Sequence, residues 1–304
     1  MDTDEYRPVI VTDEYGILKL FRKPPGKAVF LHLVGHTESI SEWEAHVLKK
    51  KFWLMLIPLV MIGINYPGNT VLPTAGEAEI PANIWAAMDA STKQELTEEP
   101  KYVALTFDDG PRRGTTDLLL NGLMERGVSA TFFVVGEQVS GNEDLILRMS
   151  DEGHQVGNHT YSHVRLLTAE KNIVIEEIRK GEVVLENLLG EQEFWLRPPY
   201  GLIDKSRASL VKTPMIYWSV DTEDWKLLDA QQIVQCVEKA IQSGDIVLLH
   251  DFYPTSVDAA LELIDCLQTK GFTFVTVEEL FRIKGVTPEA GTLYAAPEEL
   301  RPLT

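Results

Sequence analysis

The clearest signal of a functional site in this chain is a pair of histidines four positions apart, His159 and His163. At this spacing two imidazole rings lie on one side of a helical turn and can hold one divalent ion. With 7 histidines in the chain, such a pair also arises by chance, so two surface histidines are the alternative. Asp109 is the candidate third ligand, because a His-His-carboxylate set leaves positions open for water or substrate.

Two adjacent carboxylates, Asp108 and Asp109, stand directly before Gly110 and Pro111. Aspartate, glycine and proline all favour turns, so an ordinary turn is the alternative to a functional motif. If Asp109 binds a metal ion, Asp108 stays free to take a proton from the water on that ion. Asp108 is therefore a candidate general base.

His250 follows the apolar segment 246–249, which is expected to form a buried strand. A histidine at this point is either a hydrogen-bonded core side chain or the proton donor to a leaving amine. Asp224 is a candidate partner that favours the charged imidazole, and Arg197 is a candidate partner that keeps Asp108 ionised.

Trp225 and Leu248 flank two of these polar residues in the sequence. Both side chains are apolar and large enough to line a small pocket for a methyl group. We therefore add them as candidate substrate-binding residues.

The elements that must position these residues have a regular pattern from residue 102 to about 282. Short β-rich segments alternate with longer helical ones, which implies parallel strands with helices outside, in an α/β barrel or a doubly wound sheet. The expected strands are 103–107, 130–135, 155–158, 194–197, 215–220, 246–249 and 273–276, and the clearest helices are 115–126 and 169–189.

The candidate polar residues cluster immediately after expected strands. In parallel α/β folds the carboxyl ends of all strands lie on one face, where active sites are built. Segments remote in sequence would therefore converge on one mouth, at residues 108–111, 159, 197–200, 221–225 and 250–251.

Together these motifs resemble those of the polysaccharide deacetylases, the NodB-homology family (carbohydrate esterase family 4). The resemblance covers about residues 100–282 and includes all five motif segments of that family, in order. The segments are Thr106-Phe107-Asp108-Asp109-Gly110-Pro111, His159-Thr160-Tyr161-Ser162-His163, Arg197-Pro198-Pro199-Tyr200, Asp221-Thr222-Glu223-Asp224-Trp225 and Leu248-Leu249-His250.

The resemblance implies an irregular (β/α)7-type barrel and a metal-dependent hydrolase that removes acetyl groups from N-acetylated amino sugars of a polysaccharide. It implies a divalent ion, usually zinc, with cobalt, manganese or nickel as alternatives. By this resemblance, the ion would be bound by Asp109, His159 and His163. Asp108 would be the general base, and Arg197 would orient it. His250 would be the general acid, and Asp224 would tune its pKa. The backbone N–H of Tyr200 would help to bind the oxyanion, Trp225 and Leu248 would shape the acetyl pocket, and Asp221 would be structural.

Within the family, residues 250–256 and the expected export are most similar to bacterial peptidoglycan N-acetylglucosamine deacetylases. Peptidoglycan is thus the favoured polymer, and chitin oligomers, poly-N-acetylglucosamine and acetylated xylan are alternatives with the same chemistry. A silent glycan-binding module would have lost Asp108, a metal ligand or His250, and none is lost. An amide hydrolase of small non-sugar substrates is a third alternative, which export disfavours.

An apolar segment at residues 52–66 follows the basic cluster Lys49-Lys50-Lys51. This order is typical of a membrane anchor or signal segment, although the apolar part is shorter than the roughly 20 residues of a spanning helix. A buried core helix is the alternative. The charges would keep residues 1–51 in the cytoplasm and place the rest outside, anchored to the cell membrane or secreted to the cell wall. The long leader favours an uncleaved anchor, and a true start further downstream is the alternative.

The remaining sequence sets the domain plan and excludes some partners. Residues 67–100 are an expected linker, 101–284 the deacetylase domain, and 285–304 a loosely held tail. A formal net charge of −18 argues against nucleic-acid binding, and 44% hydrophobic residues suffice for a core. Cys236 and Cys266 are expected to be buried free thiols, with a single disulfide bridge as the alternative.

Overall fold

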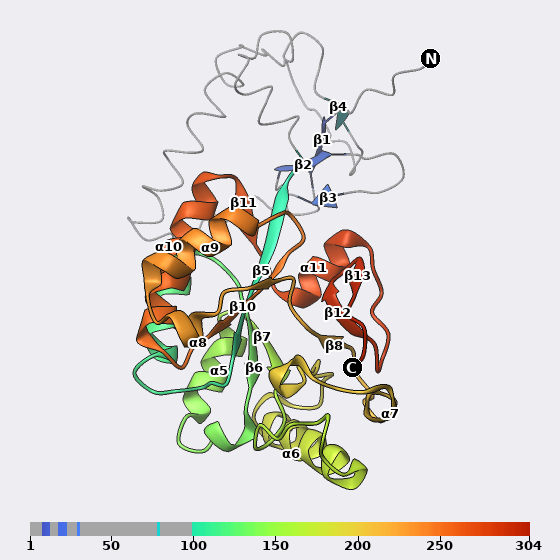
Figure 1. The fold of residues 1–304 in the computed structure, drawn as a ribbon. Coiled ribbons are helices and arrows are strands. Elements are labelled where there is room, and N and C mark those ends of the chain that lie inside the picture. Colours follow the sequence, from blue (N-terminus) through green and yellow to red (C-terminus); the bar gives the residue numbers. More distant parts are fainter. Residues whose placement is uncertain (1–7, 13–17, 23–28, 31–77, 80–98) are drawn as a thin grey trace, which may run out of the picture. The chain divides into compact units, whose positions relative to one another are not determined.

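The computed structural model describes residues 99–304 in full and, before them, only residues 8–12, 18–22, 29–30 and 78–79 (Figure 1). The chain divides into two units, Met1–Glu98 and Glu99–Thr304. In the first unit four strands form an antiparallel sheet of order β3-β2-β1-β4. They are β1 (Pro8–Thr12), β2 (Leu18–Arg22), β3 (Val29–Phe30) and β4 (Ala78–Glu79).

Two expectations concern this first unit. The apolar segment 52–66 lies outside the described residues. β4 lies within the expected linker 67–100, yet it pairs with β1, so this part of the linker belongs to a sheet. Within the described part of the chain, no helix combines the length and the apolar character needed to cross a membrane.

The second unit is built on a parallel sheet of order β7-β6-β5-β10-β9, which confirms the predicted α/β fold. β11 pairs with the first residues of β5, and single bridges at Leu196 connect β7 to β8. The strands are β5 (Lys101–Asp108), β6 (Thr131–Val134), β7 (Gln155–Asn158), β8 (Met215–Ile216), β9 (Val220–Asp221), β10 (Ile246–His250) and β11 (Phe272–Phe274).

Helices cover the outside of this sheet (Figure 1). The predicted helix 115–126 corresponds to α4 (Thr116–Arg126), which is followed by Gly127 in the left-handed conformation that glycine tolerates (φ 60°). The other long helices are α5 (Glu143–Asp151), α6 (Lys171–Leu189), α9 (Ala230–Ala240), α10 (Pro254–Thr269) and α11 (Val277–Lys284). Short turns of helix are η1 (Gly136–Gln138), η2 (Pro199–Gly201), α7 (Lys205–Ala208) and α8 (Asp224–Leu227).

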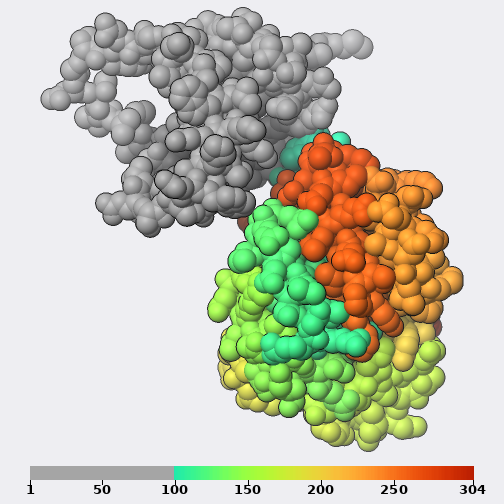
Figure 2. All heavy atoms as spheres, turned by 90° about the vertical axis from the view of Figure 1, so that its left-hand side faces the viewer, coloured from blue at the N-terminus to red at the C-terminus, as the bar shows by residue number. Residues whose placement is uncertain are grey.

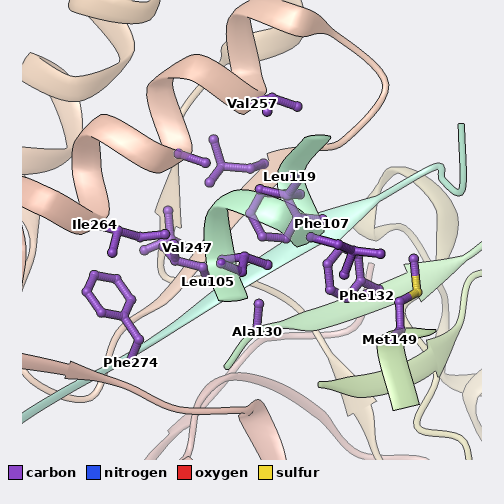
Figure 3. Close-up of a cluster of buried hydrophobic side chains, with 14 of the residues drawn as sticks. Leu105, Phe107, Leu119, Ala130, Phe132, Met149, Val247, Val257, Ile264 and Phe274 are labelled. Carbon is purple, nitrogen blue, oxygen red and sulfur yellow. The ribbon is translucent and has the colours of Figure 1, made fainter. Parts of the chain in front are cut away.

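The hydrophobic core lies between the central strands and the outer helices (Figure 3). Residues Tyr102 to Asp108 of β5 are all buried, as expected of a parallel strand covered on both faces. Phe107 stacks on Phe132 of β6 with ring centroids 5.3 Å apart. Large apolar side chains on adjacent strands hold the strand ends, and therefore the site, in register.

Helices α4 and α10 are far apart in sequence but adjoin at the surface, where green and orange residues meet in Figure 2. Arg126 of α4 forms a double hydrogen bond with Asp265 of α10, with both N···O distances 2.8 Å. Leu261 of α10 fills the space beside Gly122 that a Cβ would otherwise occupy. Both helices contribute side chains to the core cluster that includes Leu105 and Phe107 of β5, the strand that ends at Asp108.

Three sequence expectations differ from the structure. The expected strand 194–197 makes only isolated bridges, and the expected strand 215–220 is two strands, β8 and β9. The expected loose tail 285–304 instead contains β12 (Leu293–Ala296), which pairs with β8, and β13 (Glu299–Leu300). The apolar residues 293–295 are buried, and their burial offsets the entropy of ordering this segment.

The two cysteines are free, as expected, but neither is buried. Cys236 on α9 is exposed and Cys266 on α10 is half-buried, with its thiol hydrogen-bonded to Glu238. Both thiols lie on helices, but away from the side that faces the core.

Candidate active site

Three side chains converge beyond the ends of β5 and β7. Asp109 Oδ1 lies 3.5 Å from His159 Nε2 and 3.3 Å from His163 Nε2, and the three ligand atoms lie within 4.8 Å of one another. Asp109 Oδ1 is buried and accepts no hydrogen bond within the described part of the chain. Two ligand atoms about 2.1 Å from one ion lie about 3.4 Å apart at a tetrahedral angle. The cluster therefore has the spacing of a divalent-metal site.

His159 is held in the protonation state that a metal requires. Its Nδ1 lies 2.7 Å from the backbone oxygen of Arg197, which can only accept, so Nδ1 carries the hydrogen and Nε2 faces Asp109 with a lone pair. Burial lowers the pKa of His159 to about 3, despite the nearby charge of Asp109. The ring is thus neutral at physiological pH and ready to ligate.

The His159–His163 segment is a loop rather than the helical turn predicted from the spacing. Thr160 and His163 adopt left-handed backbone conformations, with φ of 65° and 56°. Asp109 has φ 73° as well. Such conformations cost of order 1–3 kcal/mol each and cluster at functional sites. The loop still brings the two rings together, with centroids 4.9 Å apart, so the predicted pairing holds for a different local reason.

Asp108 is buried and paired with Arg197. The guanidinium Nη1 donates to Asp108 Oδ1 at 2.7 Å, and its other donors reach Thr106 and the backbone oxygens of residues 216 and 217. Arg197 is fully buried, and its guanidinium lies 4.1 Å from the ring centroid of Phe133. Burial raises the pKa of Asp108, and the charge of Arg197 opposes this rise. The second carboxylate oxygen lies 3.6 Å from His159 Nε2, beside the metal cluster.

His250 is the register partner of Asp108 on the adjacent parallel strand. Its Nδ1 lies 2.8 Å from Asp224 Oδ1, and Asp224 Oδ2 accepts the backbone N–H of His250 at 2.8 Å. Burial alone would lower the pKa of His250, but the hydrogen bond and the charge of Asp224 outweigh it and raise the pKa to about 9. The ring is therefore mainly protonated at neutral pH.

The remaining candidate residues surround this centre. Tyr200 has φ 62° and is 51% exposed, and its ring centroid lies 4.7 Å from that of His163. Trp225 is 52% exposed next to Asp224, while Leu248 is buried on β10 two residues before His250. The acetyl pocket of Trp225 and Leu248 stays a prediction. Asp221 is exposed and accepts the backbone N–H of Glu223, a local turn contact.

Sequence reasoning missed one supporting residue, Asn158, and placed another, Asp251, at the mouth without a role. Asn158, fully buried, accepts the N–H of Thr160 and donates to the backbone oxygen of Ile178, both at 2.9 Å. It thereby fastens the histidine loop to α6. Asp251, also buried, hydrogen-bonds to Thr116, and its carboxylate lies against Gly110. The signal that could have indicated a role for both residues is their position, since each is a polar residue at the end of a buried strand.

The chain is similar in sequence to known proteins. The family model for polysaccharide deacetylases matches residues 95–215. Over 196 residues the chain is 38% identical to the peptidoglycan-N-acetylmuramic acid deacetylase PdaC of Bacillus subtilis, which covers 64% of this chain and 42% of that protein. Over 187 residues it is 38% identical to a peptidoglycan-N-acetylglucosamine deacetylase of Bacillus cereus, covering 59% of this chain and 68% of that protein.

The fold is shared with a solved structure of a relative. The structure of peptidoglycan deacetylase PdaC from Bacillus subtilis superposes with a TM-score of 0.60 at 38% identity, covering 62% of this chain and 93% of that one. The chain spans less than half the length of the full PdaC protein that it matches. The likeness therefore concerns the unit that carries the metal cluster.

Proposed function

The chain belongs to the polysaccharide deacetylase family, and we propose that it is a metal-dependent hydrolase that removes N-acetyl groups from N-acetylglucosamine-type residues of a cell-wall polysaccharide and releases acetate. One observation carries the proposal. A cluster with metal-ligand spacing, Asp109, His159 and His163, lies beside a buried carboxylate, Asp108, whose strand-register partner is a protonated histidine, His250.

The residues present fit a divalent ion. Asp109 Oδ1 has no hydrogen-bond partner in the described residues, and His159 is neutral with Nε2 directed at it. Two imidazoles and one carboxylate suit zinc, and cobalt, manganese or nickel accept the same donors. When bound, the ion would acidify a water molecule and polarise the acetamide carbonyl. The identity of the ion is part of the proposal.

Asp108 is the proposed general base. Burial strengthens it as a proton acceptor, because it raises the pKa of its carboxyl group. Arg197 fixes the orientation of Oδ1, so that Oδ2 is left facing the metal cluster. Asp108 would take the proton of the water that attacks the acetyl carbon.

His250 is the proposed general acid. An amide anion is too poor a leaving group to depart unaided, so the nitrogen must be protonated as the C–N bond breaks. The Nδ1–H of His250 is held by Asp224, which leaves Nε2 to donate to the departing amine. The backbone N–H of Tyr200 would help to hold the oxyanion, while Trp225 and Leu248 would contact the acetyl methyl group.

Peptidoglycan is the proposed polymer, supported by the two relatives whose names specify it. Chitin oligomers, poly-N-acetylglucosamine and acetylated xylan are the alternatives that a substrate comparison would separate. A silent glycan-binding module is disfavoured, because every proposed catalytic and metal-binding residue of the family motifs is present.

We further propose that the residue 99–304 unit acts outside the cytoplasm, anchored by or secreted through the segment 52–66. The basic cluster before this apolar segment supports the orientation. Protease added to intact wall-stripped cells that produce the protein should degrade the unit without lysis. Protection of the unit until the cells are lysed would contradict this location.

The deciding experiment measures acetate release by the full-length protein from purified peptidoglycan and from N-acetylglucosamine oligomers, with zinc added or chelated. Zinc-dependent release that is lost in Asp108→Asn and His250→Ala would support the proposal, and the faster substrate would identify the polymer. No release from any of these glycans, with zinc demonstrably bound, would overturn it.

A further inference from the structure

Three arginines of residues 99–304 differ from the other seven in having no carboxylate within 4.0 Å in that part of the chain. Arg112, Arg165 and Arg301 are these three, while the others each lie within that distance of an aspartate or glutamate. Within residues 99–304, no carboxylate neutralises the charge of these three guanidinium groups, although the full chain has 46 acidic and 28 basic residues.

Each of these three guanidinium groups instead lies over an aromatic ring. Arg112 lies 4.1 Å from the ring centroid of Phe252, Arg165 4.6 Å from that of Tyr200, and Arg301 4.5 Å from that of Tyr217. Stacking orients the planar group through its face and leaves its edge, which carries the N–H donors, uncovered. Arg112 Nη1 donates to the backbone oxygen of Phe252 at 3.0 Å, whereas the guanidinium of Arg165 donates no hydrogen bond within residues 99–304. A stacked arginine is therefore preorganised to bind a planar anion through two parallel hydrogen bonds.

Arg165 is the one of the three that the structure connects directly to the metal cluster. The Tyr200 ring contacts the His163 ring on one side, with centroids 4.7 Å apart, and carries the Arg165 guanidinium on another. Arg165 is exposed, two residues after the ligand His163. A glycan bound at the cluster would pass close to this guanidinium.

The candidate polymers differ in whether they carry an anionic group that could bind the Arg165 guanidinium. Chitin oligomers and poly-N-acetylglucosamine offer hydroxyl and acetamide groups and give a fixed cation little advantage over water. Peptidoglycan carries a lactyl ether on alternate sugars, which ends in a carboxylate when bare and in an acidic peptide when substituted. Either group provides the planar anion that a stacked guanidinium binds.

We propose that Arg165, held on the ring of Tyr200 beside the metal cluster, is a specificity-determining residue that binds a carboxylate substituent of the glycan. This inference rests on the proposed deacetylase function and adds the group that separates peptidoglycan from neutral polymers of N-acetylglucosamine. The carboxylate comes either from the lactyl ether or from the peptide attached to it.

The test compares kcat/KM of the full-length zinc-loaded protein for three substrates: chitin oligomers, peptide-free peptidoglycan strands with bare lactyl groups, and peptide-bearing strands. Arg165→Gln keeps the length and polarity of the side chain but removes its charge. We expect it to lower the anionic-to-neutral ratio of kcat/KM by about 10- to 100-fold, mainly through KM, since this is the range for one charged hydrogen-bonded pair. Arg165→Lys should recover part of the anionic-to-neutral ratio of kcat/KM, because lysine restores the positive charge but not the two parallel N–H donors of the guanidinium group.

Arg179→Gln is the matched control. Arg179 is an exposed arginine on α6 that is paired with Glu182 and Glu186, and it should leave all three rates unchanged. A loss confined to peptide-free strands would assign the lactyl carboxylate, and a loss confined to peptide-bearing strands would assign the peptide. Wild-type release with an unchanged ratio in Arg165→Gln would overturn the inference while the function stands. Absence of wild-type release from every substrate would instead overturn the function and, with it, this inference.

Discussion

Asp108 and Asp109 are neighbours in sequence, but their surroundings assign them different tasks. Asp108 is buried and hydrogen-bonded to Arg197. Asp109 instead has a left-handed backbone conformation and directs toward two histidines an oxygen that has no hydrogen-bond partner among residues 99–304. A charge-neutral amide at either position keeps the shape but removes a different function. The two adjacent substitutions are therefore each other's controls.

Asp108→Asn should retain zinc at wild-type stoichiometry and lose activity by about 10²–10⁴, the usual contribution of a general base. Asp109→Asn should lose zinc binding as well as activity, because it removes an anionic ligand. Metal content after dialysis, measured beside acetate release, separates the two effects. Loss of zinc in Asp108→Asn to the same extent as in Asp109→Asn would contradict the division of roles.

As the proposed general acid, His250 should set the alkaline side of the pH profile of kcat/KM. Burial favours the neutral ring, but Asp224 raises its pKa to about 9, so the proton-donating form persists below that pH and disappears above it. We expect kcat/KM to fall as the pH rises through about 9. Asp224→Asn removes the carboxylate charge that raises the pKa of His250, so the alkaline limb of the pH profile should move to lower pH. A limb that stays in place in Asp224→Asn would show that His250 is not the group that titrates.

At the scale of elements, close backbone contacts position the metal ligands. Gly181 of α6 lies against Asn158 and Thr160, and a Cβ at this position would overlap Asn158 Oδ1 and lie 3.2 Å from the backbone carbon of Thr160. Asn158 in turn accepts the Thr160 N–H within the histidine loop. The helix thus reaches the loop only because residue 181 has no side chain.

Gly181→Ala should destabilise the protein by about 1–3 kcal/mol through overpacking and should weaken zinc binding, because the loop must shift. Val183→Ala, at a 37% exposed position on the same helix, is the control for helix propensity and should change neither quantity by a comparable amount. Urea unfolding and a zinc competition assay measure the two effects. Unchanged zinc affinity in Gly181→Ala would mean that α6 does not position the loop.

The sequence predicted those features that require a particular residue type or a continuous run of apolar residues. β5 and β10 follow from apolar runs, and the grouping of Asp109, His159 and His163 follows from the ligand chemistry of metals. Conformations decided by distant contacts could not be predicted. The left-handed backbone at Thr160 and His163 depends on Asn158 and α6, and the order of residues 293–296 depends on pairing with β8.

At the scale of the whole molecule, the metal cluster joins segments that are far apart in the chain. Asp109 follows β5, whereas His159 and His163 follow β7, so one ion would connect two strands that are separated by β6 in the sheet. Within the part of the chain that the structure describes, the buried Oδ1 of Asp109 has no hydrogen-bond partner, and an ion would satisfy it. Because only the folded chain assembles these three candidate ligands, an ion bound there would stabilise folding.

Zinc at about 100 times its dissociation constant should stabilise the folded state by about 2.7 kcal/mol. In domains of this size, 1 kcal/mol shifts Tm by about 2–4 °C, so Tm should rise by roughly 5–10 °C. His163→Ala should lose most of this rise, since His163 is a half-buried ligand whose removal leaves the core intact. Arg179→Gln should keep it. An equal rise in His163→Ala and wild type would place the stabilising ion elsewhere, because a ligand can stabilise only the state in which its site exists.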